Sequence, residues 1–266
     1  METIQLPALQ PGKKIYFASD NHLGAPDLAS SRPREKQFVK WLSDIQADCQ
    51  VLILVGDLFD FWFEYKTVVP KGFVRVLGKL AEMADQGIDI HYFVGNHDLW
   101  MFGYFEEELG IPVYHETRLF ICGETRFFVA HGDGLGPGDR GFKLMKKVFT
   151  NKVCQWLFRW FHPDLGVRLA QHLSVNNKII SGEADTRFLG EDKEWLILYA
   201  KRKLEEAHYD YFIFGHRHLP LQLQLKENSD YVNLGDWIVY LTYAVYDGSS
   251  LSLESLPEGR KSLISN

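Results

Sequence analysis

Polar residues that could bind metal ions follow five separate apolar runs in this sequence. Each run is short, mostly apolar and rich in β-branched or aromatic residues, which is typical of a buried strand. The polar clusters that end them are Asp20-Asn21-His22, Gly56-Asp57-Leu58-Phe59-Asp60, Gly95-Asn96-His97-Asp98, His131-Gly132-Asp133 and Gly215-His216-Arg217-His218. Because α/β folds place ligands at the carboxyl ends of strands, five such ends predict one shared site.

The donors in these clusters are of mixed type, with two carboxylates, one amide oxygen and four imidazoles. They are Asp20, His22, Asp57, Asn96, His131, His216 and His218. Mixed nitrogen and oxygen ligands suit manganese, iron, zinc, cobalt or nickel better than magnesium or calcium, which prefer oxygen. Seven side chains are too many for one ion. The set predicts two divalent metal ions that share one carboxylate, with Mn²⁺ expected first and iron or zinc as alternatives.

The charge of such a centre favours phosphate chemistry. Two divalent ions and two carboxylates leave a surplus of about +2, which attracts an anionic ester and stabilises the charge on phosphoryl oxygens in the transition state. Two neighbouring ions also lower the pKa of a shared water toward about 7. The cluster set therefore predicts an enzyme, a metal-dependent hydrolase of phosphoric esters.

Composition narrows the class of protein. A chain of 266 residues with 46% hydrophobic content suits one domain over residues 1–266. The formal net charge of -6 argues against general nucleic-acid binding. The cysteines Cys49, Cys122 and Cys154 form no CxxC pair, and no run of eighteen apolar residues is present. We expect a cytoplasmic protein without a membrane span.

The elements that must position the clusters alternate along the first third of the chain. Strands at 14–19, 51–55 and 88–94 are separated by a helix that Pro33 opens and a helix at 72–86, which predicts parallel β-α-β units. On the second helix the predicted apolar face consists of Val74, Leu77, Leu80, Ala81 and Ala84. Later elements are expected as a hairpin at 119–122 and 126–130, a helix at 192–207, a strand at 211–214, and antiparallel strands at 231–234, 238–246 and 251–253.

Residues 138–190 interrupt this alternation and are predicted to be a helical insertion, or cap. Residues 140–187 contain nine basic and three acidic residues, which gives this segment a net charge of +6 in an acidic protein. Aromatic residues such as Trp156, Trp160 and Phe161 lie among them. The segment could clamp an anionic amphiphile and touch the inner membrane surface peripherally through 140–187. The alternative is a cap buried on the sheet with ordinary solvated lysines.

The set DNH, GDLFD, GNHD, HGD and GHRH, in this order over residues 15–236, resembles the calcineurin-like metallophosphoesterase family. The resemblance implies an α/β (α+β) fold, a β-sandwich of two mixed sheets flanked by helices. It also implies a first metal on Asp20, His22, Asp57 and His218, and a second metal on Asp57, Asn96, His131 and His216. Asp57 would be the shared ligand.

The same resemblance gives His97 a catalytic role beside the leaving group, as general acid or as a stabiliser of phosphoryl oxygens. Asp98 could orient His97, or it could cap its loop with a hydrogen bond. Asp60 matches no ligand position of the family. It is expected to support a ligand histidine or to cap the following turn.

Within that family the layout resembles the pyrophosphatases that cleave UDP-2,3-diacylglucosamine to UMP and 2,3-diacylglucosamine 1-phosphate in lipid A synthesis. The shared features are the length, GDLF before an aromatic stretch, HGDxL followed by Asp139, the helical insertion, and GHxHxP at 215–220. This likeness implies an amphiphilic UDP-sugar lipid as substrate. The implied substrate contacts are Asn96, His97, Asp139, Lys178 and His216.

Two alternatives stay open. Well-known members of that group carry arginine where this chain has His97, whereas GNHD is common across the wider family. A soluble metallophosphoesterase that acts on nucleotides, cyclic nucleotides or phosphoproteins is therefore the second hypothesis. A non-catalytic interaction module is the third, and the presence of all seven donors argues against it.

Overall fold

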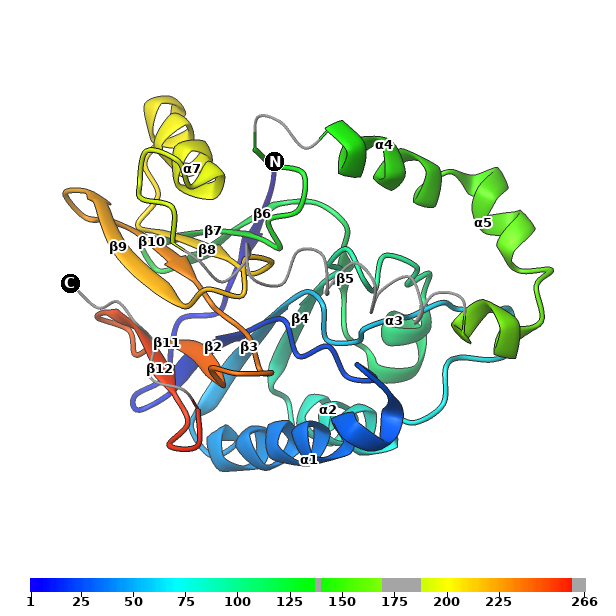
Figure 1. Ribbon diagram of the computed structural model, residues 1–266. Coiled ribbons are helices and arrows are strands. Elements are labelled where there is room, and N and C mark those ends of the chain that lie inside the picture. The colour runs from blue at the N-terminus through cyan, green and yellow to red at the C-terminus, as the bar shows by residue number, and fades with distance from the viewer. Residues whose placement is uncertain (137–139, 169–187, 260–266) are drawn as a thin grey trace.

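Two mixed six-stranded sheets form the centre of the computed structural model, which describes residues 1–136, 140–168 and 188–259 (Figure 1). One sheet has the order β12-β11-β2-β3-β4-β5 and the other has the order β1-β6-β7-β8-β10-β9. The strands are β1 (Glu2–Gln5), β2 (Lys14–Ala18), β3 (Cys49–Val55), β4 (Asp89–Phe93), β5 (Val113–Tyr114), β6 (Arg118–Cys122), β7 (Thr125–Ala130), β8 (Tyr211–Phe214), β9 (Leu221–Lys226), β10 (Ser229–Asn233), β11 (Thr242–Tyr246) and β12 (Leu251–Ser255). The expected sandwich of two mixed sheets is confirmed.

Alternation along each strand explains the layers. In β2 and β3, Phe17 and Ile53 belong to the core between the two sheets, while Tyr16 and Leu52 belong to the core on the outer face. That outer face is covered by α1 (Leu28–Ile45), α2 (Val74–Asp85) and α3 (Tyr104–Leu109). Helix α7 (Trp195–Glu206) covers the outer face of the other sheet, where it buries Ile197.

The predicted parallel units are present, since β2, β3 and β4 pair in parallel. Helix α1, however, begins at Leu28 rather than at Pro33, because the Asp27 side chain accepts a hydrogen bond from the Ser30 amide at 2.9 Å and caps the helix there. The predicted face of α2 is confirmed in part, because Leu80 is buried and Leu77 and Ala84 pack against the core. Its buried residues are Val76, Lys79, Leu80 and Met83, whereas Val74 is 78% exposed.

The C-terminal strands differ from the prediction in two ways. Strands β11 and β12 are antiparallel as expected, but β10 pairs in parallel with β8 and antiparallel with β9, a strand that the sequence pattern did not predict. Residues 237–240 form a turn instead of the start of a strand. The Asp236 carboxylate holds this turn by accepting hydrogen bonds from the amides of Ile238, Val239 and Tyr240.

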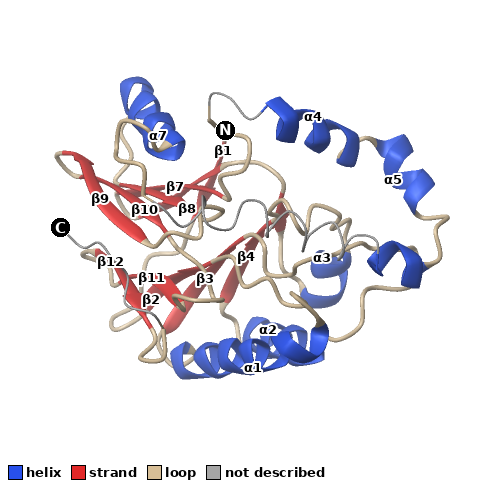
Figure 2. Ribbon diagram, viewed as in Figure 1, coloured by secondary structure: helices blue, strands red, loops and turns tan. Residues whose placement is uncertain are grey.

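The described residues of the 138–190 segment are largely helical. Helices α4 (Arg140–Phe149) and α5 (Lys152–Phe158) run along one side of the sandwich, and a further helical stretch covers 163–168 (Figure 2). The cap is attached to the core through Trp100, whose indole nitrogen donates to the Phe149 carbonyl at 2.7 Å. Among the described residues, no helix combines the length and the apolar character needed to cross a membrane.

Candidate metal centre

The strand ends bring the seven predicted donors together at one edge of the sandwich. Strands β2, β3 and β4 are parallel to one another, and so are β7 and β8. The loops that follow these strands therefore lie together at the carboxyl ends of the strands. Asp20, His22, Asp57 and His131 are buried there. The other three donors, Asn96, His216 and His218, contact this group through their side chains.

Most of these donors sit on a strained backbone. Asp20, His22, Asp57, His216 and His218 all have positive φ angles, between 44° and 68°. For a residue other than glycine such a conformation costs on the order of 1–3 kcal/mol and persists only where the surroundings enforce it. Its recurrence at five predicted ligands indicates that the loops are shaped for function rather than for stability.

Backbone hydrogen bonds hold the first two loops in this strained form. The Asp20 amide donates to the Gly56 carbonyl at 3.1 Å, and the His22 amide donates to the Asp57 carbonyl at 2.9 Å. From helix α1, Arg34 Nη2 donates to the carbonyls of His22 and Ala25 at 2.6 and 2.7 Å. The loops after β2 and β3 are therefore fixed to each other and to α1.

A first set of donors surrounds one position. His22 Nε2 lies 3.1 Å from His218 Nε2, and these two nitrogens lie 3.7 and 3.4 Å from Asp20 Oδ1. Asp57 Oδ2 is 3.7 Å from His22 Nε2. We call this group, Asp20, His22, Asp57 and His218, the first position.

A second set shares the same carboxylate oxygen. Asp57 Oδ2 lies 3.4 Å from His131 Nε2, which in turn lies 3.3 Å from Asn96 Oδ1. His216 Nδ1 lies 2.8 Å from that amide oxygen. We call Asp57, Asn96, His131 and His216 the second position. Asp57 Oδ2 lies between the two sets, which supports its expected role as the shared ligand.

The histidines turn their lone pairs toward these positions. His131 Nδ1 lies 2.8 Å from the Val55 carbonyl, His22 Nδ1 lies 3.3 Å from Asp60 Oδ1, and His218 Nδ1 lies 3.4 Å from an Asp236 oxygen. Carbonyl and carboxylate oxygens accept a proton at Nδ1, so the lone pair is on Nε2. At the first position the Nε2 lone pairs of His22 and His218 point toward Asp20 Oδ1 and toward each other. These lone pairs and the carboxylate oxygen repel one another unless a cation lies between them.

Asp20 Oδ1 adds independent support for a cation. The Asp20 side chain is fully buried, and within the described part of the chain this oxygen has no hydrogen-bond donor. Burying an acceptor without a partner costs roughly 1–3 kcal/mol. A divalent ion would satisfy this oxygen. The residues of both positions therefore fit divalent metal ions by their donor types and by their arrangement.

Glycines allow the carboxylates to approach the main chain. A Cβ atom on Gly95 would overlap the Asp57 carboxylate, and one on Gly215 would lie 2.5 Å from Asp20 Oδ2. Gly56 has a φ of +88°, and a Cβ there would lie 2.6 Å from His131 Nδ1. The glycines of the GD, GN and GH motifs are therefore required by the close packing of the donors.

The pKa values follow from this crowding. Burial would raise the pKa of Asp57, but the neighbouring His131 and His97 and their hydrogen bonds lower it well below its usual range. Burial would lower the pKa of His131, but the neighbouring Asp57 carboxylate raises it to about 10. At His216 burial dominates and lowers the pKa to about 3. Asp57 is thus ionised and His216 neutral, as ligands must be. His131 is held protonated beside Asp57 and must release a proton when it binds a metal ion.

His97 lies at the rim of the centre. Its amide donates to Asp57 Oδ1 at 2.8 Å, and its ring Nδ1 lies 3.1 Å from the Asp60 carbonyl oxygen and 3.6 Å from Asp60 Oδ1. The side chain keeps 17% of its surface exposed, so it can reach a bound substrate. This geometry agrees with the role predicted for His97, which stays a prediction.

The two acids near His97, Asp60 and Asp98, each match one of their two predicted roles. The fully buried Asp98 carboxylate accepts hydrogen bonds from the amides of Gly95 (2.7 Å) and Phe59 (3.4 Å) and from the Tyr92 hydroxyl. The loop-cap alternative is therefore correct for Asp98, and its role as orienting partner of His97 was wrong. Asp60 lies beside both His22 and His97, which matches its expected support of a ligand histidine.

Of the predicted substrate contacts, Asn96, His97 and His216 lie in the centre, while Asp139 and Lys178 lie outside the described residues. The cap meets the centre at Asp133, two residues after His131. Lys146 Nζ from α4 lies 2.5 Å from Asp133 Oδ2, and the Asp133 side chain is buried. This ion pair was not predicted from the sequence.

The sequence analysis also missed Asp236 and Arg34. Asp236 follows β10 in the run Val-Asn-Leu-Gly-Asp, which repeats the pattern of an apolar strand ending in Gly-Asp. That repeat is a signal that could have found Asp236. No comparable signal marks Arg34, because an arginine on an amphipathic helix is ordinary.

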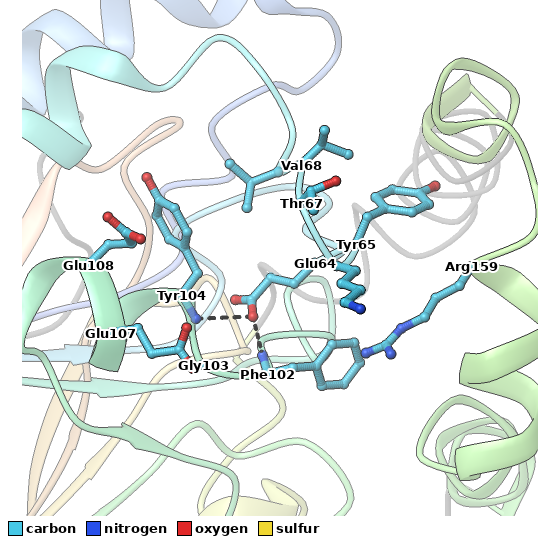
Figure 3. Close-up of a pocket in the computed structure, with 12 residues that line it drawn as sticks. Glu64, Tyr65, Thr67, Val68, Phe102, Gly103, Tyr104, Glu107, Glu108 and Arg159 are labelled. Atoms are coloured by element: carbon cyan, nitrogen blue, oxygen red, sulfur yellow. Dashed lines mark hydrogen bonds between the residues drawn. The ribbon is translucent and has the colours of Figure 1, made fainter.

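A cavity of about 400 Å³ lies where the cap approaches the loops that follow Asp60 and His97 (Figure 3). At its floor the Glu64 carboxylate accepts hydrogen bonds from the amides of Phe102 and Tyr104 at 2.6 and 3.1 Å. From the cap, the Arg159 guanidinium lies 5.3 Å from the centroid of the Phe102 ring. The cap and the core therefore line a common cavity through apolar and charged side chains.

Known proteins resemble this chain in sequence. Residues 13–220 match the model of the calcineurin-like phosphoesterase family. A relative from Porphyromonas gingivalis, named UDP-2,3-diacylglucosamine hydrolase, is 38% identical over 259 residues, which cover 92% of this chain and 98% of that one. A relative of the same name from Shewanella baltica is 22% identical with the same coverage. Among solved structures, Vacuolar Protein Sorting 29 from Cryptosporidium parvum is similar with a TM-score of 0.46 and 13% identity, covering 94% of this chain and 95% of that one.

Proposed function

The chain belongs to the calcineurin-like phosphoesterase family, and from this membership we propose that it cleaves the diphosphate of UDP-2,3-diacylglucosamine. Water adds across one P–O bond of the diphosphate, and the products are UMP and 2,3-diacylglucosamine 1-phosphate. The observation that carries this assignment is the 38% identity, over nearly the full length of both chains, to the relative that bears this substrate in its name. The reaction would place the protein in lipid A biosynthesis.

The proposed cofactors are two divalent metal ions. Mn²⁺ is the first choice, with iron or zinc as alternatives, because the donors are imidazoles, carboxylates and one amide without a thiolate. Asp20, His22 and His218 would hold one ion, Asn96, His131 and His216 would hold the other, and Asp57 would hold both. When bound, such ions polarise phosphoryl oxygens and lower the pKa of a water that they share.

The chain's own residues would bind and orient the diphosphate. Asn96 and His216 lie at the second position, where their side chains can contact a phosphoryl oxygen as well as an ion. His97 at the rim would donate a proton to the leaving oxygen or a hydrogen bond to the phosphoryl group. Asp139 and Lys178 remain proposed contacts of the sugar-phosphate part of the substrate.

The cap supports an amphiphilic substrate. Phe158 packs inward against Phe63 and Trp100, with ring centroids 4.8 Å apart in both pairs. Trp156 and Trp160 are 55% and 75% exposed, which favours an amphiphile-binding surface over the alternative of a cap buried on the sheet with ordinary solvated lysines. Basic residues such as Lys147 and Lys152 are exposed on the same helices. We propose that this surface contacts acyl tails and, through 140–187, the anionic surface of the inner membrane from the cytoplasmic side.

One observation favours a second candidate. His97 belongs to a GNHD motif that is not confined to enzymes of lipid A synthesis. A soluble phosphodiesterase or phosphatase that acts on nucleotides, cyclic nucleotides or phosphoproteins would need the same metal centre but would have no use for an exposed aromatic cap. The two candidates therefore differ in their dependence on that cap.

Replacing Trp156, Trp160 and Phe161 together by glutamine is expected to lower kcat/KM for the lipid substrate by about 100-fold, since each lost aromatic contact contributes on the order of 1 kcal/mol. Hydrolysis of bis(p-nitrophenyl) phosphate, which has no acyl tail, should change less than about twofold, because its reaction uses the metal centre alone. Both activities would be measured on the same preparation.

The matched control is Val74→Gln, which polarises an exposed apolar residue on α2, outside the cap. It should leave both activities at the wild-type level. An equal loss of both activities in the triple variant, or an unchanged lipid activity, would argue for the soluble candidate.

A further inference from the structure

We propose that Asp236 is a positioning residue that fixes His218 as a metal ligand and makes the first position the tighter of the two. This inference rests on the two-metal centre of the proposed function. It adds a residue that matches no donor in the family motifs, and an order in which the ions bind. The argument starts from how the Asp236 carboxylate is held.

One oxygen of Asp236 is occupied by the main chain. Oδ1 accepts hydrogen bonds from three successive amides, those of Ile238, Val239 and Tyr240, at 2.8, 2.6 and 3.2 Å. The side chain is buried, and the next residue, Trp237, donates its amide to the Asp20 carbonyl at 3.1 Å. The carboxylate therefore cannot rotate without breaking the turn at 237–240, so Oδ2 stays directed at His218.

The oxygen Oδ2 lies 3.4 Å from His218 Nδ1. A carboxylate in this place accepts the Nδ1 proton and leaves the lone pair on Nε2. His218 Nε2 lies 3.4 Å from Asp20 Oδ1 and 3.1 Å from His22 Nε2, inside the first position. Asp236 thus selects the tautomer in which His218 can be a ligand, and it increases the basicity of that nitrogen.

The two positions differ in their negative charge. The first has two carboxylates as donors, Asp20 and Asp57, and both of its imidazoles are backed by carboxylates, from Asp60 and Asp236. The second shares Asp57 but has the neutral amide of Asn96 instead of another carboxylate. Its His131 is backed by a neutral carbonyl, that of Val55.

Asp133 does not remove this difference. Asp133 lies two residues after His131, and its carboxylate forms an ion pair with Lys146 at 2.5 Å. The positive charge of Lys146 offsets the negative charge that Asp133 would add to the second position.

At the first position Arg34 interacts electrostatically with Asp60 and Asp236 and offsets part of their charge. The donor carboxylates still number two there, Asp20 and Asp57, against Asp57 alone at the second position. Because a cation is attracted more strongly by the larger negative charge, the first position should fill first.

Asp236→Asn tests this role without removing the turn. The three amides of 238–240 need an acceptor oxygen, so the amide nitrogen of asparagine must face His218 and favour the tautomer with its proton on Nε2. Loss of such an orienting group typically weakens metal binding about 10–100-fold. The measurement is a titration of the full-length protein with Mn²⁺, in which electron paramagnetic resonance reports the free ion.

The matched control is Asp247→Asn, because Asp247 Oδ1 likewise accepts the amides of Ser249 and Ser250 at 2.8 and 2.9 Å, in an exposed turn. Wild type and Asp247→Asn should bind two ions with unequal affinities. In Asp236→Asn only the tighter of the two should weaken, about 10–100-fold, and retained binding at the other position shows that the variant is folded.

Two ions bound by Asp236→Asn with wild-type affinities would overturn the proposal, as would a loss confined to the weaker position. A wild-type protein that binds no Mn²⁺ would overturn the metal centre as well. Since the titration contains no substrate, a failure of the lipid assignment alone would leave its result unchanged.

Discussion

Asp57→Ala is expected to reduce metal-dependent phosphoester hydrolysis by at least about a thousandfold, because the ions supply several kcal/mol of transition-state stabilisation. Asp57 Oδ2 approaches the imidazoles of both positions, His22 at 3.7 Å and His131 at 3.4 Å. Its removal would take a ligand from both ions and would leave the two sets of donors unconnected.

The measurement is the Mn²⁺-stimulated rate with bis(p-nitrophenyl) phosphate, together with the number of ions bound per chain. Asp44→Ala, on the exposed side of α1, is the matched control, since its partner Lys40 forms only a surface pair. The control should keep full activity and two ions. If Asp57→Ala retained activity within tenfold of wild type, the role of Asp57 as shared ligand would be refuted.

His97→Gln is expected to lower hydrolysis of a substrate with a poor leaving group by about 10²–10³-fold, in the range typical of general acid catalysis. The loss should be much smaller with a p-nitrophenyl ester, whose leaving group departs without a proton. Binding of two ions should be unchanged, because the His97 side chain is directed at Asp60 and the rim.

His208→Gln provides the control, since His208 is an exposed histidine that pairs with Asp210 on the surface. It should leave both activities unaltered. Equal losses of His97→Gln on the two esters would exclude proton donation by His97 and would leave only a part in stabilising the phosphoryl group.

The sheets could be predicted because their strands are buried on both faces. Runs such as Val51 to Val55 are continuously apolar, and a parallel β-α-β connection is the economical way to place three of them side by side. The face of α2 could not be predicted in the same way, because Lys79 occupies a buried position. Its ammonium donates to the side chains of Gln46 and Glu82 at 2.5 and 3.0 Å, so a charged residue replaces an apolar one in the pattern.

The seven predicted donors, which the structure brings together, could be proposed from sequence because each follows a strand and each has a chemical type that binds metal. The residues that orient them could not be found so directly. Asp60 and Asp236 act through contacts between loops that are distant in the chain, and the positive φ angles of five donors are imposed by the assembled loops. For Asp98 the sequence left two roles open, orienting His97 or capping the loop, and only the structure shows that the amides of the neighbouring loops occupy its oxygens.

The centre is unfavourable without cations, because Asp20 Oδ1 has no hydrogen-bond donor among the described residues and the Nε2 atoms of His22 and His218 lie close together. The surrounding sandwich provides the stability that holds this arrangement and its strained backbone in place. The exposed aromatic residues of the cap, Trp156 and Trp160, are a second local cost that an amphiphilic ligand or a membrane surface would relieve.

The most direct test of the proposed function is the release of UMP from UDP-2,3-diacylglucosamine by the purified full-length chain. The assay would run in detergent micelles with Mn²⁺, with EDTA in a parallel sample and 3′,5′-cyclic AMP as a competing class of substrate. We predict UMP release that EDTA abolishes and Mn²⁺ restores, with kcat/KM at least about 100-fold above that for the cyclic nucleotide. Absence of UMP together with rapid hydrolysis of the cyclic nucleotide would contradict the account.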